Sequence, residues 1–182
     1  MSFPRIILLA YLLCLSQFSF GQEFFTETGY VNFLSKASLN EFNGESKQLN
    51  GLIDLDKNLL DFYIDLNTLK TGIGLRDRHM RENYLETNKY PYAEFTGKIA
   101  EGPELKNGES RKVTATGKFT IHGVERKIEV PGTIKRVNNN TVELEANFKV
   151  LLGDYKIDIP KVMFYELSEE QTVTIKAELK KK

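Results

Sequence analysis

Apolar and polar residues alternate along most of the chain after residue 29, with the period of two that is typical of strands buried on one face. The alternation is clearest in four segments, at residues 60–67, 92–99, 112–121 and 141–150. A weaker form of the pattern predicts four further strands, at residues 30–37, 48–56, 124–136 and 172–179. Turn-forming sequences, such as Asp56-Lys57-Asn58 and His122-Gly123, separate neighbouring segments. We therefore expect about eight antiparallel strands.

One segment, Gly74 to Leu85, has the period of a helix instead. One face of this helix carries Ile73, Arg76, Met80 and Tyr84. Ion pairs would support the helix, because opposite charges lie four positions apart in the pairs Asp77–Arg81 and Arg78–Glu82. We expect one short helix near residues 74–85.

Eight strands with one apolar face each need more cover than one helix gives, so the sheet must form two packed layers or close on itself. A closed barrel of eight strands can hold one small ligand. The predicted inward positions mix large residues with small ones, namely Phe62, Phe95, Phe119 and Phe148 with Ala93, Gly97, Ala115, Gly117 and Ala146. This mixture favours a barrel with a slot along its axis, but an interdigitated sandwich core also fits the pattern.

The N-terminal segment has the pattern of a secretory signal. Arg5 provides a basic start and Ile6 to Leu15 is an almost unbroken apolar run. Ten residues of helix span about 15 Å, half of a bilayer core of roughly 30 Å, so we expect no transmembrane anchor. We predict a cleaved signal peptide at 1–21, a single mature domain at 22–182, and a periplasmic or secreted location. Cys14, the only cysteine, would leave with the signal and is not expected to be lipidated.

The charge and the composition exclude several classes of function. Removal of Arg5 leaves 24 basic and 25 acidic residues without a basic stripe, so no binding to nucleic acid is expected. The mature chain has no cysteine and only two histidines, His79 and His122, so neither a metal site nor another cofactor is expected. The basic end Lys180-Lys181-Lys182 is compatible with weak, transient contact with anionic lipid.

The densest polar cluster, Arg76-Asp77-Arg78-His79-Met80, leaves three roles open for His79. The helix could cap one end of the barrel, the cluster could contact a ligand, or His79 could act in catalysis. The pattern offers no nucleophile near His79, which argues against an enzyme. His122 is predicted to be an exposed turn residue, with Gly123 supplying a positive φ.

Four motifs, in order and at compatible spacing, resemble those of the YceI-like family. They are Thr71-Gly72 with Arg76-Asp77-Arg78-His79-Met80; Lys89-Tyr90-Pro91-x-x-x-Phe95; the stretch Gly117 to Val124, similar to "G-x-L-T-I-H-G-V"; and Gly153-Asp154-Tyr155-Lys156-Ile157. The matches extend from about Tyr30 to Leu179. One departure is Lys156, which stands where the family usually has glycine, at a loop by one mouth.

The resemblance implies an all-β, lipocalin-like fold, a single extended eight-stranded antiparallel barrel around a long apolar ligand. Members of the family are described as periplasmic or secreted binders of polyisoprenoid, quinone-like and other amphiphilic lipids. We therefore expect a protein that binds, carries or stores an isoprenoid, quinone or fatty-chain lipid, without catalysis and without a cofactor. The sequence leaves open whether it forms a homodimer.

The expected ligand contacts follow from the inward face and the polar cluster. We expect the chain of the ligand to lie along Phe33, Phe62, Ile64, Phe95, Phe119, Ile121 and Phe148. We expect the head group to lie near Arg76, His79, Met80, Tyr90 and Tyr155. The alternative is a β-domain whose interior is filled by its own side chains and which serves as a structural or protein-interaction module.

Overall fold

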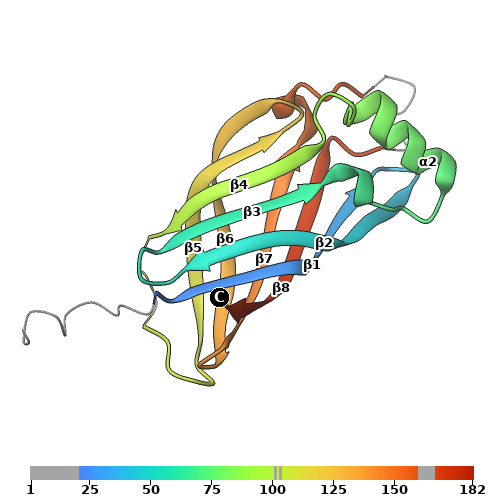
Figure 1. The fold of residues 1–182 in the computed structure, drawn as a ribbon. Helices are drawn as coiled ribbons and strands as arrows, with labels where there is room; N and C mark the ends of the chain where they lie inside the picture. The colour runs from blue at the N-terminus through green and yellow to red at the C-terminus, as the bar shows by residue number, and fades with distance from the viewer. Residues whose placement is uncertain (1–20, 101, 103, 160–166) are drawn as a thin grey trace, which may run out of the picture.

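Eight antiparallel strands close into one barrel in the order in which they occur in the chain (Figure 1). The computed structural model describes residues 21–100, 102, 104–159 and 167–182, so residues 1–20 of the predicted signal peptide, with Cys14, lie outside the described residues. The strands are β1 (Glu23–Lys36), β2 (Glu41–Asp54), β3 (Leu59–Asp65), β4 (Tyr92–Ile99), β5 (Ser110–Ile121), β6 (Val124–Asn138), β7 (Thr141–Leu151) and β8 (Glu170–Lys181). The closed barrel is confirmed and the sandwich is excluded, because β1 pairs with β8 as well as with β2.

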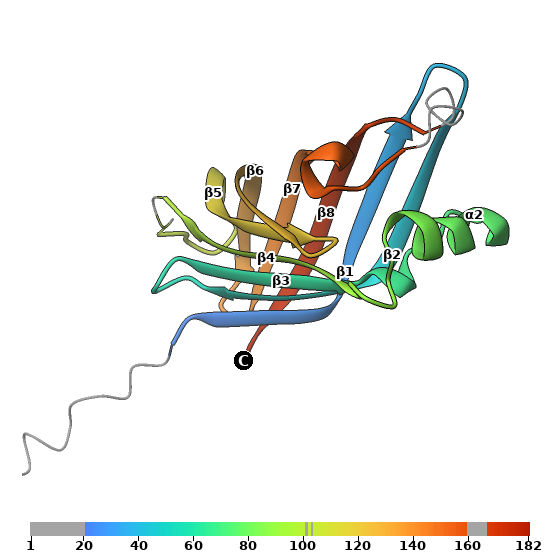
Figure 2. The same cartoon turned by 90° about the horizontal axis from the view of Figure 1, so that it is seen from above.

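The predicted helix is confirmed as a short α-helix, α2 (Gly74–His79), that continues directly into a π-helical turn (Met80–Tyr84). It lies outside the barrel wall, beside the ends of β1 and β2 (Figure 2). No helix within the described ranges is long and apolar enough to cross a bilayer.

Two strands begin earlier than the sequence predicts. β1 begins at Glu23 and not near residue 30, and β2 begins at Glu41 and not near residue 48. Irregular pairing of β1 with β2 on either side of Gly29 breaks the period of two in β1. The start of β2 carries polar residues on both faces, so that alternation alone does not reveal it.

The two ends of the barrel differ in their packing. At the end that holds the C-terminus, the interior is filled by side chains without solvent exposure, among them Phe24, Ile53, Ile134, Val142 and Leu179. Two of the ladders are incomplete toward the α2 end. β2 pairs with β3 only through Asn50–Asp54, so the start of β2 has no partner on β3. β6 pairs with β7 only from Gly132 onward, so the start of β6 has no partner on β7. Pro131 has no N–H to donate and immediately precedes that second ladder.

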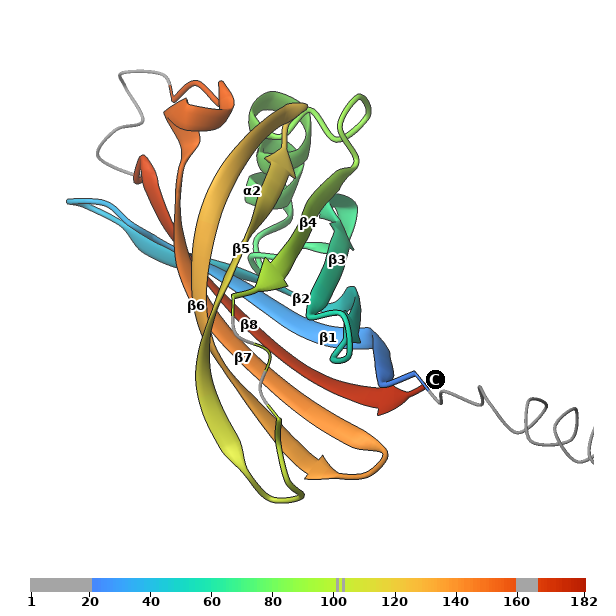
Figure 3. The same ribbon diagram turned by 90° about the vertical axis from the view of Figure 1, so that its left-hand side faces the viewer.

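Connecting segments cover both incomplete parts of the wall. Lys70, in the loop after β3, exchanges two backbone hydrogen bonds of 2.9 Å with Glu45 of β2. On the other side, β6 and β7 separate toward α2, and the 3-10 turn η3 (Leu152–Tyr155) follows β7 there (Figure 3). Arg126 of β6 donates to the Asp154 carbonyl at 2.7 Å and pairs with the Asp154 carboxylate at 3.1 Å. In these parts of the wall at the α2 end, loops and short helices therefore take the place of strands.

The residue after η3, Lys156, has a left-handed backbone, with φ 58° and ψ 31°. This is the position at which the sequence departs from the family glycine, and the conformation is one that glycine adopts without a Cβ clash. We expect Lys156→Gly to raise the free energy of unfolding by about 0.5 to 1 kcal/mol, since relief of the clash exceeds the added entropy of the unfolded chain. Urea unfolding measures the change. Lys156→Ala is the control and should give no gain; equal stability of the two variants would contradict the interpretation.

Candidate ligand-binding cavity

A cavity of about 400 Å³ occupies the α2 end of the barrel. Its walls are almost entirely apolar and come from most of the strands, from the α2 segment and from the residues that follow β7. This volume is within the range of pockets that bind small organic molecules. The barrel is thus a container at one end and a packed core at the other.

Aromatic rings lie close against glycines of the same or a neighbouring strand along the cavity wall. The Phe62 ring covers Gly51, its register partner on β2, so closely that a methyl group at Gly51 would overlap the ring. Phe33 covers Gly44 in the same way, and the Phe95 ring lies over Gly97. Because glycine has no side chain, the rings occupy the wall and leave the centre of the cavity open.

The structure brings most of the sequence-predicted contact residues together around this cavity. Nine of the twelve line it: Phe33, Phe62, Ile64, Arg76, His79, Met80, Phe95, Phe119 and Ile121. The other three, Tyr90, Phe148 and Tyr155, are not lining residues. The rings of Phe148 and Tyr155 pack edge-on against Phe119, with centroids at 5.6 Å and 5.5 Å. Burial raises the pKa of the Tyr155 hydroxyl.

Tyr90 packs against His122 at 4.9 Å and does not reach the cavity. The prediction that His122 is exposed is wrong, since its side chain is only 12% exposed. Its Nδ1 lies 3.0 Å from the Tyr155 carbonyl oxygen and its Nε2 lies 2.9 Å from the Glu86 carboxylate. These two contacts link the turn to the segment after α2 and to the residues that follow β7. The positive φ of Gly123, 69°, is as predicted, and His122 itself has a φ of 54°.

Asp77 fixes the start of α2 to the preceding loop. Its carboxylate is buried and accepts hydrogen bonds from the Thr71 backbone N–H at 2.7 Å and from the Thr71 hydroxyl at 2.6 Å. Burial raises the pKa of Asp77, but these hydrogen bonds and the charges of Lys70 and Arg81 outweigh it, and the pKa lies below its ordinary value. The Asp77 carboxylate is therefore charged when it holds the start of the helix.

The predicted ion pairs within the helix are wrong. Asp77 bonds to Thr71 in place of Arg81, and Arg78 forms no ion pair with Glu82 within the described part of the chain. Arg76 instead lies over the ring of Phe42, 4.2 Å from its centroid. This cation–π contact holds Arg76 at the cavity rim, where Ile73, Leu75 and His79 are also lining residues.

Sequence reasoning did not select several other lining residues, some of which lie on loops or strand starts with weak patterns. They include Phe42, Leu49, Leu152, Ile157, Val173 and Ile175. For β8 the signal was present, since Val173, Ile175 and Ala177 alternate with polar residues. No periodicity marks Leu152, in the turn after β7, or Ile157, which lies just after that turn.

Comparison with known proteins places this geometry in a family. A family model described as the YceI-like domain matches residues 24–180. A polyisoprenoid-binding domain from Saccharophagus degradans, implicated in plant cell wall breakdown, superposes with a TM-score of 0.78 at 21% identity, over 89% of this chain and 99% of that chain. BcnA of Burkholderia cenocepacia superposes with a TM-score of 0.67 at 20% identity, over 83% of this chain and 95% of that chain. The YCEI protein of Campylobacter jejuni superposes with a TM-score of 0.61 at 23% identity, over 76% of this chain and 84% of that chain. No curated protein matches the sequence.

Proposed function

Because this chain belongs to the YceI-like family, we propose that it binds a long-chain amphiphilic lipid, such as an isoprenoid, a quinone or a fatty-chain compound, and carries or stores it without catalysis. The observation that carries the proposal is the apolar cavity at the α2 end. Each methylene transferred into such a cavity contributes about 0.8 kcal/mol, so a chain of modest length binds without any specific hydrogen bond.

We propose that the polar head group of the lipid stays at the rim, near Arg76 and His79. These two side chains lie on the lining at the α2 end, where they offer a fixed cation and an imidazole to polar atoms. The nine lining residues would contact the ligand directly. Tyr90, Phe148 and Tyr155 would act by holding His122 and Phe119 in place.

We propose further that the protein works outside the cytoplasm, in the periplasm or as a secreted carrier. The basic start and the short apolar run of residues 1–21 support this location. A lipid with a long apolar chain needs a protein container to cross an aqueous compartment, which is the task that this cavity suits.

Native mass spectrometry of the full chain, purified without detergent and followed by organic extraction, tests the proposal. The expected result is an added mass that extracts into organic solvent as a prenyl or other lipid chain. A mass equal to that of the protein alone, unchanged after incubation with ubiquinone, a polyprenol and a fatty amide, would contradict it. That result would favour the alternative of a ligand-free structural or interaction module.

A further inference from the structure

The rim of the cavity carries cations beside exposed aliphatic side chains. Ile73 and Leu75 line the cavity, yet they are 50% and 54% exposed. Lys70, Arg76 and Arg78 lie within the same stretch of chain, and none of the three has an ion-pair partner among the described residues. We name these five residues the mouth patch.

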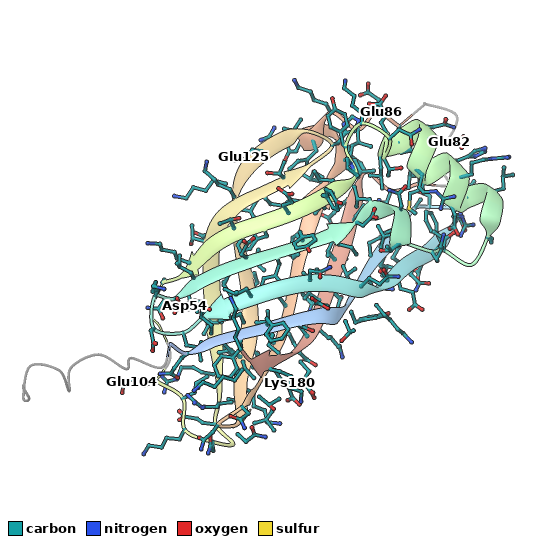
Figure 4. The ribbon with its side chains drawn as sticks, in the orientation of Figure 1. Asp54, Glu82, Glu86, Glu104, Glu125 and Lys180 are labelled. Atoms are coloured by element: carbon teal, nitrogen blue, oxygen red, sulfur yellow. The ribbon has the colours of Figure 1, made fainter. Side chains whose placement is uncertain are left out.

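The opposite end of the barrel is basic in sequence, but two of its three terminal lysines are paired. Lys180 pairs with Glu178, and Lys182 pairs with Glu23 at 3.6 Å. Figure 4 places Lys180 at the end away from α2 and places Glu82 and Glu86 at the α2 end. The opposite end also has a cation without an ion pair among the described residues, Lys181, and an exposed ring, Phe25, but neither lines the cavity. The mouth patch combines three cations without an ion pair in the described part of the chain with exposed aliphatic side chains that do line the cavity.

We propose that the mouth patch docks the protein on an anionic lipid bilayer, with the rim of the cavity facing the membrane. Cations near an anionic surface are attracted to it, and Ile73 and Leu75 are placed to enter the interface between head groups and acyl chains. This inference rests on the proposed lipid ligand, because docking at the rim lets the ligand pass between bilayer and cavity without crossing water.

An acidic protein surface would also attract the cations, but the bilayer explains more of the patch. The aliphatic residues belong to the lining of the cavity itself, so a partner that covers them also covers the exit of the ligand. An acidic protein would block that exit and offer no apolar phase. A bilayer supplies both the negative charge and the phase in which a long-chain lipid dissolves.

Co-sedimentation of the full chain with lipid vesicles tests the docking. We expect the protein to bind vesicles that contain phosphatidylglycerol more strongly than vesicles of pure phosphatidylcholine, and to lose binding as salt is raised. Arg78→Glu changes the patch by two charge units without touching the cavity lining. Each unit near an anionic surface is worth roughly a fivefold change in partitioning, so a loss of roughly 25-fold is expected. Leu75→Ser should weaken binding further at high salt, where the apolar contact remains.

The matched control is Lys180→Glu, which makes the same charge change at the other end of the barrel. Equal losses for Arg78→Glu and Lys180→Glu would overturn the proposal, and so would equal binding to both kinds of vesicle.

The extraction experiment on Arg78→Glu separates the docking proposal from the proposal of a lipid carrier. An Arg78→Glu variant that retains lipid but does not bind vesicles supports both membrane docking and the lipid carrier. A wild-type protein that binds phosphatidylglycerol vesicles through Arg78 but never retains lipid leaves docking intact and rejects the lipid carrier. Lipid retention with no vesicle binding by the wild-type protein rejects docking alone.

Discussion

Ala93→Phe is expected to abolish lipid uptake by this barrel while leaving the barrel folded. Ala93 is buried on β4, beside its register partner Ile64, and both residues line the cavity. A benzyl group at residue 93 would fill space that the ligand chain needs. Exclusion of about four methylenes removes roughly 3 kcal/mol of transfer free energy, which is about a hundredfold in affinity. The new ring enters a cavity and not a packed core, so the cost in stability stays at the low end of the 1–3 kcal/mol that is usual for overpacking.

Two further variants keep this prediction testable. Thr96→Phe adds the same ring on the outer face of β4 and should bind ligand as the wild type does. Val173→Phe approaches the cavity from β8 and should block it independently of β4. Fluorescence titration with a dansylated fatty acid, alongside circular dichroism of each variant, measures affinity and fold. Full binding by folded Ala93→Phe and Val173→Phe proteins would show that the ligand does not occupy this cavity.

Alternation of inward and outward residues was sufficient to predict the strands, but it left barrel and sandwich open, and the family resemblance supplied the barrel. In β3 and β4 every predicted inward residue is buried or partly buried, and the prediction extended to the aromatic lining at Phe62, Phe95 and Phe119. Alternation states which face a residue occupies but not how far along the axis the interior remains open. Phe62 and Phe24 both point inward, and only the first lines the cavity.

The rim could not be predicted for a different reason, because it depends on contacts between segments distant in sequence. The α2 ion pairs followed from spacing alone, yet Thr71 competes for Asp77 and Phe42 attracts Arg76. His122 was expected to be exposed because the turn itself places it at the surface. Glu86 and Tyr155, 36 and 33 residues away, then enclose its ring. Such contacts leave no periodic signal in the chain.

Acid is expected to loosen the α2 segment through Asp77. The folded pKa of Asp77 lies below its ordinary value of 3.8, so the charged carboxylate stabilises the fold above that pH, and this contribution is lost as the pH falls through the folded pKa. Asp77→Ala removes the acceptor of two charge-assisted hydrogen bonds, each worth about 1.5 to 3 kcal/mol. We expect it to lower the free energy of unfolding at pH 7 by about 3 kcal/mol. Asp77→Asn keeps a neutral acceptor, so its free energy of unfolding should lie between those of the wild type and Asp77→Ala.

The pH dependence separates this role from simple packing. Asp54 also has a lowered pKa: burial raises it, but the hydrogen bonds and charge of Lys57 outweigh that effect. Asp54 is present in every variant, so the difference between wild type and Asp77→Asn isolates Asp77. Urea unfolding should give a difference that is constant near neutral pH and shrinks below about pH 4. A difference that does not change with pH would mean that the Asp77 charge contributes nothing. Thr71→Val, which removes one donor, should reduce the effect of Asp77→Asn in a double-mutant cycle, because the Thr71 hydroxyl is one of the two donors to the Asp77 carboxylate.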